Sequence, residues 1–333
     1  TIEDLSTEIT EDELKEAFVD GRGVKYSKDG RKLLGVSGKL SGAYSVKEGT
    51  RIICDSAFFW CGSLFEIVIP ASVTSIGDWA FSFCSSLIYI SIPKSVIYLN
   101  GNPFAEWNGK LECLSPNYIY EDDILFNKDK SRIISFRNQN IESYVIPSSV
   151  TSIGDRAFYG CSSLSEIVIP SSVTSIGDRA FYGCNSLSEI VIPSSVTSIG
   201  KGAFRGCNSL SEIVIPSSVT SIGDSAFSFC DSLSEIVILS SVTSIGDRAF
   251  SGCRSLSEIV IPSSVTSIGD RAFSRCSSLK YISIPKSVIG LNGNPFAEWN
   301  GKLECLSPNF VYEDDVLFNK DKSRIISFRN QNI

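Results

Sequence analysis

The sequence predicts a β-rich solenoid, and three observations carry this prediction. Cysteines recur every 23 residues from Cys161 to Cys276, and Cys61 and Cys84 keep the same spacing. The phrase "SSVTSIGDRAFYGC", which begins at Ser148, returns with few changes at five later positions. Each repeat also contains a short run of alternating apolar residues. A fixed period of about 20 to 50 residues is typical of chains whose units bury their apolar faces only against their neighbours.

The first half of each unit predicts a short strand. In "LSEIVIP", Ile167 and Ile169 take inward positions, whereas Glu166 and Val168 face outward, because side chains alternate across a strand. Pro170 ends the strand, since it has no N–H to donate to a continuing ladder. The strands of successive units are therefore expected to stack in parallel, about 4.8 Å apart.

The second half of each unit predicts a corner. Val173 and Ile176 point inward from a second extended segment, and Gly177 allows a tight turn. The following "DRAF" forms a short convex turn that carries Ala180 and Phe181 into the core. Each inward position then becomes a column through the protein, with one column of phenylalanine and another of cysteine.

The repeat L-x-x-I-x-I-P-x-x-V-x-x-I-G-x-x-A-F-x-x-C resembles the leucine-rich repeat of the BspA-like family, also called the Treponema pallidum type. Regular units cover about two thirds of the chain. The resemblance implies a leucine-rich repeat right-handed superhelix at the surface of, or secreted from, a bacterium or a protozoan parasite. It also implies an adhesin-like protein that binds host extracellular-matrix or receptor proteins.

Three segments interrupt the 23-residue rhythm of the sequence. Asp29-Gly30 separates two apolar runs and predicts a β-hairpin over 24–36, and segments 124–136 and 316–328 repeat its pattern. An insert that contains "NPFAEWNG" precedes the second and third hairpins. We therefore expect one continuous solenoid in five parts: a helical cap over 1–20, the first hairpin and repeats over 21–98, an insert and hairpin over 99–140, regular repeats over 141–290, and a truncated second copy of the insert over 291–333.

The helical cap is predicted from its N-terminal residues. Thr10 followed by Glu13 is typical of a capping box, and Leu14 and Phe18 would share one helical face. A helix here would cover the first turn, whose apolar core and strand edge would otherwise be exposed.

The composition excludes several function classes. The chain has no histidine, which rules out every His-based triad and His-containing metal site. A net charge of −7 disfavours nucleic acid and anionic membranes as partners. No apolar run approaches the roughly 18 residues of a membrane helix. We expect a monomer without enzymatic activity, cofactor, metal or direct membrane insertion.

The cysteines are predicted to be structural. Eight of the eleven hold one repeat position, where neighbouring side chains point the same way and are poorly placed to form disulfides. We expect buried thiols there. Cys54, Cys113 and Cys305 lie outside this column, and the sequence leaves their redox state open.

Two sets of residues are candidates for contacting a partner. The first is an outward strip of glutamate and valine on successive strands, which we call the Glu/Val strip: Glu166, Val168, Glu189, Val191, Glu212, Val214, Glu235, Val237, Glu258 and Val260. Its alternative interpretation is an exposed sheet kept soluble by alternating polar residues. The second set is the aromatic residues of the two inserts, which either anchor a partner or pin their own loops: Phe104, Trp107, Phe296 and Trp299.

These candidates favour a binding protein over an enzyme. Repetition multiplies weak contacts, so a solenoid face suits an adhesin-like protein. Two alternatives remain: a structural spacer that carries another domain, and a carbohydrate-binding module that uses the tryptophan loops.

Overall fold

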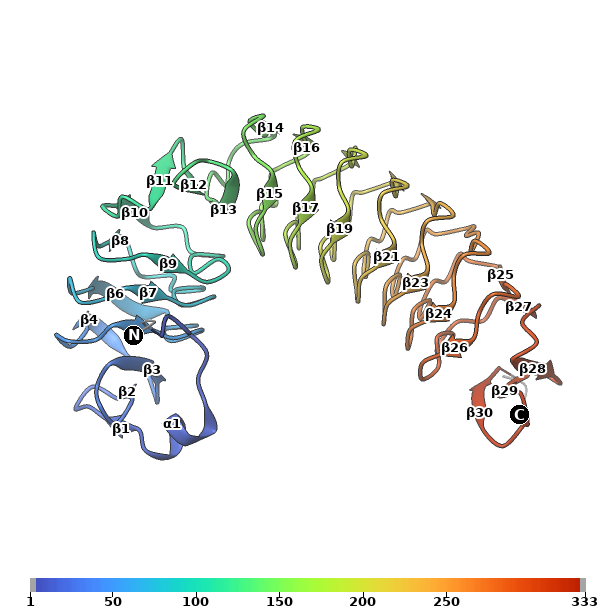
Figure 1. Cartoon of the computed structure of the whole chain (residues 1–333), viewed down its shortest axis with the longest axis horizontal. Helices are drawn as coiled ribbons and strands as arrows, with labels where there is room; N and C mark the ends of the chain where they lie inside the picture. Colours follow the sequence, from blue (N-terminus) through green and yellow to red (C-terminus); the bar gives the residue numbers. More distant parts are fainter. Residues whose placement is uncertain (1–3, 330–333) are drawn as a thin grey trace. The chain divides into compact units, whose positions relative to one another are not determined.

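The computed structural model describes residues 4–329 and confirms the predicted β-solenoid. The chain divides into two compact units, unit 1 (Thr1–Asn138) and unit 2 (Gln139–Ile333). Each unit is a stack of short turns joined by parallel strands, as Figure 1 shows. The predicted truncation at the C-terminus falls on residues 330–333, which lie outside the described part of the chain.

Unit 1 begins with the helix α1 (Glu11–Lys15) and builds one six-stranded sheet. The sheet has the order β1 (Phe18–Val19), β2 (Val24–Tyr26), β3 (Lys32–Val36), β5 (Ile52–Ile53), β7 (Ser75–Ile76) and β9 (Tyr98–Leu99). Two parallel pairs form the neighbouring face, β4 (Ser41–Ser45) with β6 (Ser63–Val68), and β8 (Tyr89–Ile92) with β10 (Lys110–Cys113). The antiparallel strands β11 (Tyr118–Glu121), β12 (Ile124–Asn127) and β13 (Arg132–Phe136) follow.

Unit 2 repeats this arrangement with shorter strands. The outward strands form three parallel groups. The first contains β14 (Ser143–Val145), β16 (Glu166–Val168) and β18 (Glu189–Ile190), and the second contains β20 (Glu212–Val214) and β22 (Glu235–Val237). The third contains β25 (Tyr281–Ile284) and β27 (Lys302–Cys305). The strands before each corner are β15 (Ser152–Ile153), β17 (Ser175–Ile176), β19 (Ser198–Ile199); and β21 (Ser221–Ile222), β23 (Ser244–Ile245), β24 (Ser267–Ile268), β26 (Gly290–Leu291). The unit closes with antiparallel β28 (Phe310–Glu313), β29 (Val316–Asn319) and β30 (Ile325–Phe328).

The three predicted hairpins are confirmed, and each is part of a three-stranded meander. β2 pairs antiparallel with β3, β12 with β13 and β29 with β30. The strand that precedes each hairpin, namely β1, β11 or β28, was not predicted from the sequence. The hairpin turns place Gly30, Lys130 and Lys322 in the left-handed region, with φ of 72°, 56° and 60°.

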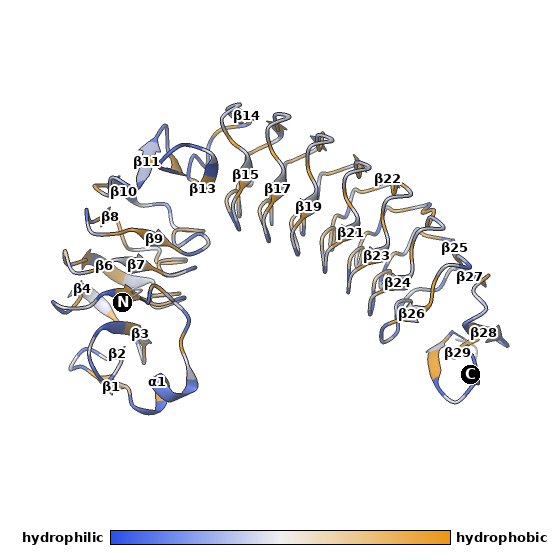
Figure 2. Cartoon of the chain, viewed as in Figure 1, coloured by the Kyte–Doolittle hydropathy of each residue, from blue (hydrophilic) through white to orange (hydrophobic). Residues whose placement is uncertain are grey.

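The core consists of the predicted columns. The phenylalanine rings of unit 2 stack from Phe158 to Phe296 with centroids 5.0 to 6.2 Å apart. Cys207 Sγ donates a hydrogen bond to the carbonyl of Phe181 at 3.2 Å, and the other column thiols with a described bond repeat this contact. Figure 2 shows apolar and polar residues alternating along the turns. Burial of these columns, at about 25 cal/mol per Å² of apolar surface, drives the stacking of turns.

The inserts do not interrupt the core rhythm, which corrects the sequence analysis. Phe104 stacks on Phe81 at 6.0 Å, and Phe296 stacks on Phe273 at 6.2 Å. Trp107 stands 23 residues after Cys84, at the position where a column cysteine would otherwise lie. The insert is two residues shorter than a regular turn only after Trp107, since Tyr89 of β8 and Lys110 of β10 pair at a spacing of 21 residues instead of 23.

The N-terminal cap differs in part from its prediction. The capping box of Thr10 and Glu13 is confirmed. However, α1 ends at Lys15 and buries no residue, so Leu14 is 51% exposed and Phe18 lies in β1 instead of on the helix. The helix is too short to present an apolar face. An ion pair of 2.8 Å between Glu13 and Lys32 connects it to β3 instead.

Candidate functional site

Most of the Glu/Val strip lies on the exposed face of the outward strands β16, β18, β20 and β22 of unit 2. Val191 follows the end of β18, and Glu258 and Val260 lie in a turn whose predicted outward strand does not form. Glu166 pairs in register with Glu189, and Glu212 pairs with Glu235. The glutamate and valine side chains of the strip are exposed. The isoleucine that lies between each glutamate and its valine is buried. The alternation expected from the sequence therefore holds, and it places the acidic column beside an aliphatic one.

The valines give this strip unusual apolar exposure. Val191 is 80% exposed and Val260 is 78% exposed, and even Val168 is 46% exposed. None of the strip glutamates forms an ion pair in the part of the chain that the structure describes. The strip therefore offers carboxylates and aliphatic surface without internal partners.

A carboxylate at the corner links most turns to the next. Asp155 Oδ1 accepts the N–H of Asp178 at 2.9 Å, and Asp178 Oδ1 accepts the N–H of Lys201 at 2.7 Å. Lys201 has no carboxylate to continue this series, and its ammonium lies 3.4 Å from Asp224 Oδ2. The series resumes where Asp224 Oδ1 accepts the N–H of Asp247 at 3.0 Å.

The strand ladders are interrupted at the turn that carries Lys201. β18 ends one outward group and β20 begins the next, and β19 and β21 divide the other sheet at the same turn. A Cβ placed on Gly200 would lie 2.4 Å from the nitrogen of Asp178, whereas a Cβ on Gly223 would find its nearest neighbour at 3.3 Å. The missing carboxylate thus accompanies a wider spacing between these two turns.

The Glu/Val strip is hollowed at this interruption. A groove of about 340 Å³ crosses β18, β20 and β22, and its outward lining side chains are Glu189, Val191, Glu212, Val214, Glu235 and Val237. Carboxylates on one side and exposed valines on the other suit an extended segment that alternates basic and aliphatic residues.

The aromatic residues of the inserts lie in the core, which corrects their assignment as surface contacts. Phe104 and Phe296 are 1% exposed, Trp107 is 2% exposed and Trp299 is 4% exposed. Trp107 Nε1 donates to the carbonyl of Leu87 at 2.7 Å, and Trp299 repeats this bond to Leu279. The alternative interpretation, a loop pinned by its own aromatic side chains, describes what the structure shows.

An arginine and a glycine complete the packing of each buried indole. The guanidinium of Arg137 lies 4.4 Å from the Trp107 ring, and that of Arg329 lies 4.3 Å from Trp299. A Cβ on Gly109 would stand 2.3 Å from the Trp107 ring. The glycine-rich composition of the insert therefore reflects close packing.

The eight column cysteines are free thiols, as predicted, and so are Cys54, Cys113 and Cys305, whose redox state the sequence left open. Burial raises the pKa of Cys54 and of Cys207 to about 12. Cys54 is therefore an inert core residue. Cys113 and Cys305 are half-buried, and burial raises their pKa as well.

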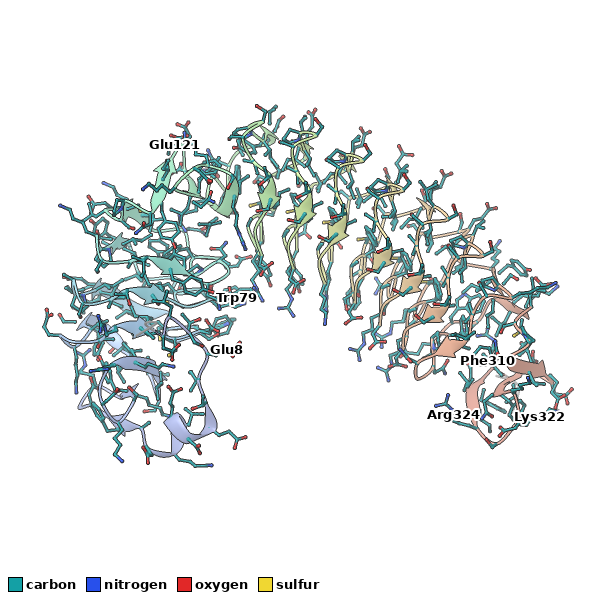
Figure 3. The ribbon with its side chains drawn as sticks, viewed as in Figure 1. Glu8, Trp79, Glu121, Phe310, Lys322 and Arg324 are labelled. Carbon is teal, nitrogen blue, oxygen red and sulfur yellow. The ribbon has the colours of Figure 1, made fainter. Side chains whose placement is uncertain are left out.

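The second and third meanders each carry an acidic tripeptide, Glu121–Asp123 and Glu313–Asp315, at the turn between their first two strands. Asp122 and Asp123 have φ of 48° and 60°, and Asp123 Oδ1 accepts a hydrogen bond from Tyr120 at 3.0 Å. Glu121, at the tip labelled in Figure 3, forms an ion pair with Lys130. Within residues 4–329, no group of three or more Cys, Asp or Glu side chains is placed to hold a metal ion.

One exposed feature was not predicted from the sequence: an aromatic cluster in unit 1. Phe59, Trp60, Trp79 and Phe83 gather at the corners of two turns. The signal was present, because Trp60 and Phe83 directly precede a column cysteine, where glycine stands in four turns of unit 2.

A stack of 23-residue turns with apolar columns and an outward face defines a leucine-rich repeat protein. Residues 43–122, 132–257, 205–307 and 243–331 match the family described as "BspA type Leucine rich repeat region (6 copies)". The chain therefore belongs to the BspA-type leucine-rich repeat family, whose repeats are typically non-catalytic and support protein interaction.

The solved structures that are similar to this chain include two bacterial leucine-rich repeat proteins. A leucine-rich repeat protein from Eubacterium ventriosum is 26% identical, with a TM-score of 0.62, and the match covers 84% of this chain and 93% of that one. A leucine rich cell surface protein from Faecalibacterium prausnitzii is 31% identical, with a TM-score of 0.52, over 76% of this chain and 59% of that one. None of the curated proteins matches. Among the described residues, no helix combines the length and the apolar composition that crossing a bilayer requires.

Proposed function

We propose that this chain is a non-enzymatic, adhesin-like protein, at the cell surface or secreted, that binds protein partners through the Glu/Val strip. The observation that carries the proposal is the groove at Glu189, Glu212 and Glu235, where unpaired carboxylates border exposed valines. The relative from Faecalibacterium prausnitzii, a cell surface protein, supports the location.

The chemistry of the strip selects the partner. Its carboxylates favour a basic segment, and its valine column favours aliphatic residues on the same segment. Repetition along the stacked turns multiplies contacts that are individually weak. We expect such a segment in a host extracellular-matrix or receptor protein, bound by a monomer of this chain.

The test is a charge reversal in the groove. We expect Glu189→Lys, Glu212→Lys and Glu235→Lys together to weaken binding of purified extracellular-matrix proteins to the immobilised chain by about tenfold or more. Binding to the wild type should also weaken as salt increases, because exposed charges are screened.

A matched control reverses three acidic residues outside the strip, Glu8, Glu48 and Asp122. This control should bind like the wild type at the same ionic strength. Equal losses in both triple variants would mean that net charge, and not the strip, determines binding.

A further inference from the structure

The aromatic cluster of unit 1, which we call the aromatic corner, consists of three stacked rings and a fourth ring packed edge to face against them. Trp60 stacks on Phe83 with centroids 5.1 Å apart, and Phe83 stacks on Trp79 at 6.4 Å. Phe59 meets Trp79 and Phe83 edge to face, at 5.9 and 5.5 Å. Trp60 is 68% exposed and Phe59 is 41% exposed, so the stack lies outside the core columns. Trp79 is labelled in Figure 3.

The backbone at these positions does not favour aromatic residues. Trp60, Trp79 and Phe83 have φ of 63°, 59° and 59°, in the left-handed region where a side chain is unfavourable. The position of Trp60 and Phe83 is glycine in four turns of unit 2, with φ of 70° to 78°: Gly160, Gly183, Gly206 and Gly252. The residue after the corner aspartate is left-handed in both units, as at Trp79 and Arg179, so the strain at Trp79 belongs to the repeat. What distinguishes the aromatic corner is an exposed aromatic ring at Trp60, where four turns of unit 2 have glycine.

The aromatic corner borders a groove of about 460 Å³. Phe59 and Trp60 line it together with apolar side chains of α1 and β3, including Leu14 and Leu34. Phe83 covers one face of Trp60 and does not line the groove, so the indole meets the groove with its remaining surface.

The charges in this groove have one sign. Lys25 and Lys39 are its charged lining residues, and no carboxylate or side-chain amide is among the lining residues. Two lysines disfavour a cationic ligand. The lack of amide and carboxylate groups disfavours a sugar, whose hydroxyls need such partners.

We propose that the aromatic corner and this groove form a second protein-interaction surface, which binds an acidic peptide segment that carries an aromatic anchor residue. The anchor packs against Trp60 and the apolar wall of the groove, and the flanking carboxylates pair with Lys25 and Lys39. This surface lies in unit 1 and prefers the opposite charge to the Glu/Val strip, so it is independent of the proposed function.

The experiment uses the full chain and three synthetic peptides, DEFDE, DEADE and KRFKR, with binding measured by isothermal titration calorimetry. We expect DEFDE to bind saturably and more tightly than either of the others. Trp60→Gly should weaken DEFDE binding by about tenfold or more, and so should the double variant Lys25→Glu with Lys39→Glu. Because glycine stands at this position in four other turns, Trp60→Gly should fold normally.

Phe229→Gly is the matched control, since it makes the same kind of change at the same corner position in unit 2. It should leave DEFDE binding unchanged, and so should the triple reversal of Glu189, Glu212 and Glu235. The proposal is overturned if DEFDE does not bind, if DEADE or KRFKR binds as tightly, or if Trp60→Gly keeps the wild-type affinity. None of these outcomes bears on the Glu/Val strip, which is tested with different variants and partners.

Discussion

The corners of the two units share one backbone and display different side chains. In unit 1 the N–H of Phe58 donates to the carbonyl of Ala80 at 2.9 Å, and in unit 2 Phe158 donates to Ala180 at 2.8 Å. The residue after the corner aspartate is left-handed in both, with φ of 59° at Trp79 and 52° at Arg179. Yet unit 1 carries a cluster of four aromatic rings at its corners, where unit 2 carries mainly arginine, glycine and one stacked pair of tyrosines, Tyr159 and Tyr182.

This difference shows which positions the solenoid leaves open to function. The columns below the corners are alike, since Cys84 and Cys207 both donate to a phenylalanine carbonyl, at 3.1 and 3.2 Å. The columns determine the path of the backbone, so the corner can change its side chains without losing its shape. Binding chemistry can therefore differ between two parts of one repetitive chain.

The largest expected effect tests what the units share, the thiol columns. Burial raises the pKa of Cys61 to about 11 and of Cys207 to about 12. Well below about pH 8.5 the thiols are protonated in both the folded and the unfolded state, and the free energy of unfolding does not depend on them. Between about pH 9 and the folded-state pKa, the thiols of the unfolded chain are ionised and those of the folded chain keep their protons. Over this range each thiol lowers the free energy of unfolding by about 1.4 kcal/mol per pH unit.

Urea unfolding between pH 8 and pH 11 checks this expectation, because the contributions of several buried thiols add. Cys207→Ala and Cys61→Ala should each make the decline shallower, and the contribution of Cys61 should begin to level off near pH 11, before that of Cys207. A free energy of unfolding that stays constant up to pH 11 would contradict the assignment of these residues as buried thiols.

An intermediate effect is expected at the corner glycines of unit 2. A methyl group at Gly200 would overlap the backbone of Asp178, so Gly200→Ala should destabilise by about 1 to 3 kcal/mol. Gly223 faces the turn of Lys201 and has more space. Gly223→Ala should therefore remain within about 1 kcal/mol of the wild type in urea unfolding. Equal losses in the two variants would mean that the turns are evenly spaced at Lys201.

The smallest effect concerns the left-handed position directly before the column cysteine, which is Trp60 in unit 1 and Gly183 in unit 2. Gly183 has φ of 70° and open space around it, so Gly183→Ala should destabilise by about 1 kcal/mol through backbone strain. Trp60→Gly relieves the same strain but loses ring contacts of similar size, so its stability should change by less than about 1 kcal/mol. Thermal unfolding compares them, and a large loss for Trp60→Gly would assign the aromatic corner to folding instead of binding.

The sequence by itself determined the repeat, the inward columns, the hairpin turns and the outward Glu/Val strip. Each depends on spacing or on local turn chemistry, which can be read along the chain. The place of Trp107 in the cysteine column could also have been predicted, because it keeps the 23-residue distance from Cys84. Its large ring in a polar, glycine-rich segment favoured a surface loop instead.

Only the tertiary structure decided which features meet across turns. Trp60 and Phe83 are 23 residues apart in sequence and stack because the corners of neighbouring turns are hydrogen-bonded. The groove in the Glu/Val strip likewise coincides with a corner where Lys201 replaces an aspartate on another part of the turn. A repeat specifies what one turn contains, but contacts between non-repeating residues depend on how turns are spaced, and side-chain packing and hydrogen bonds set that spacing.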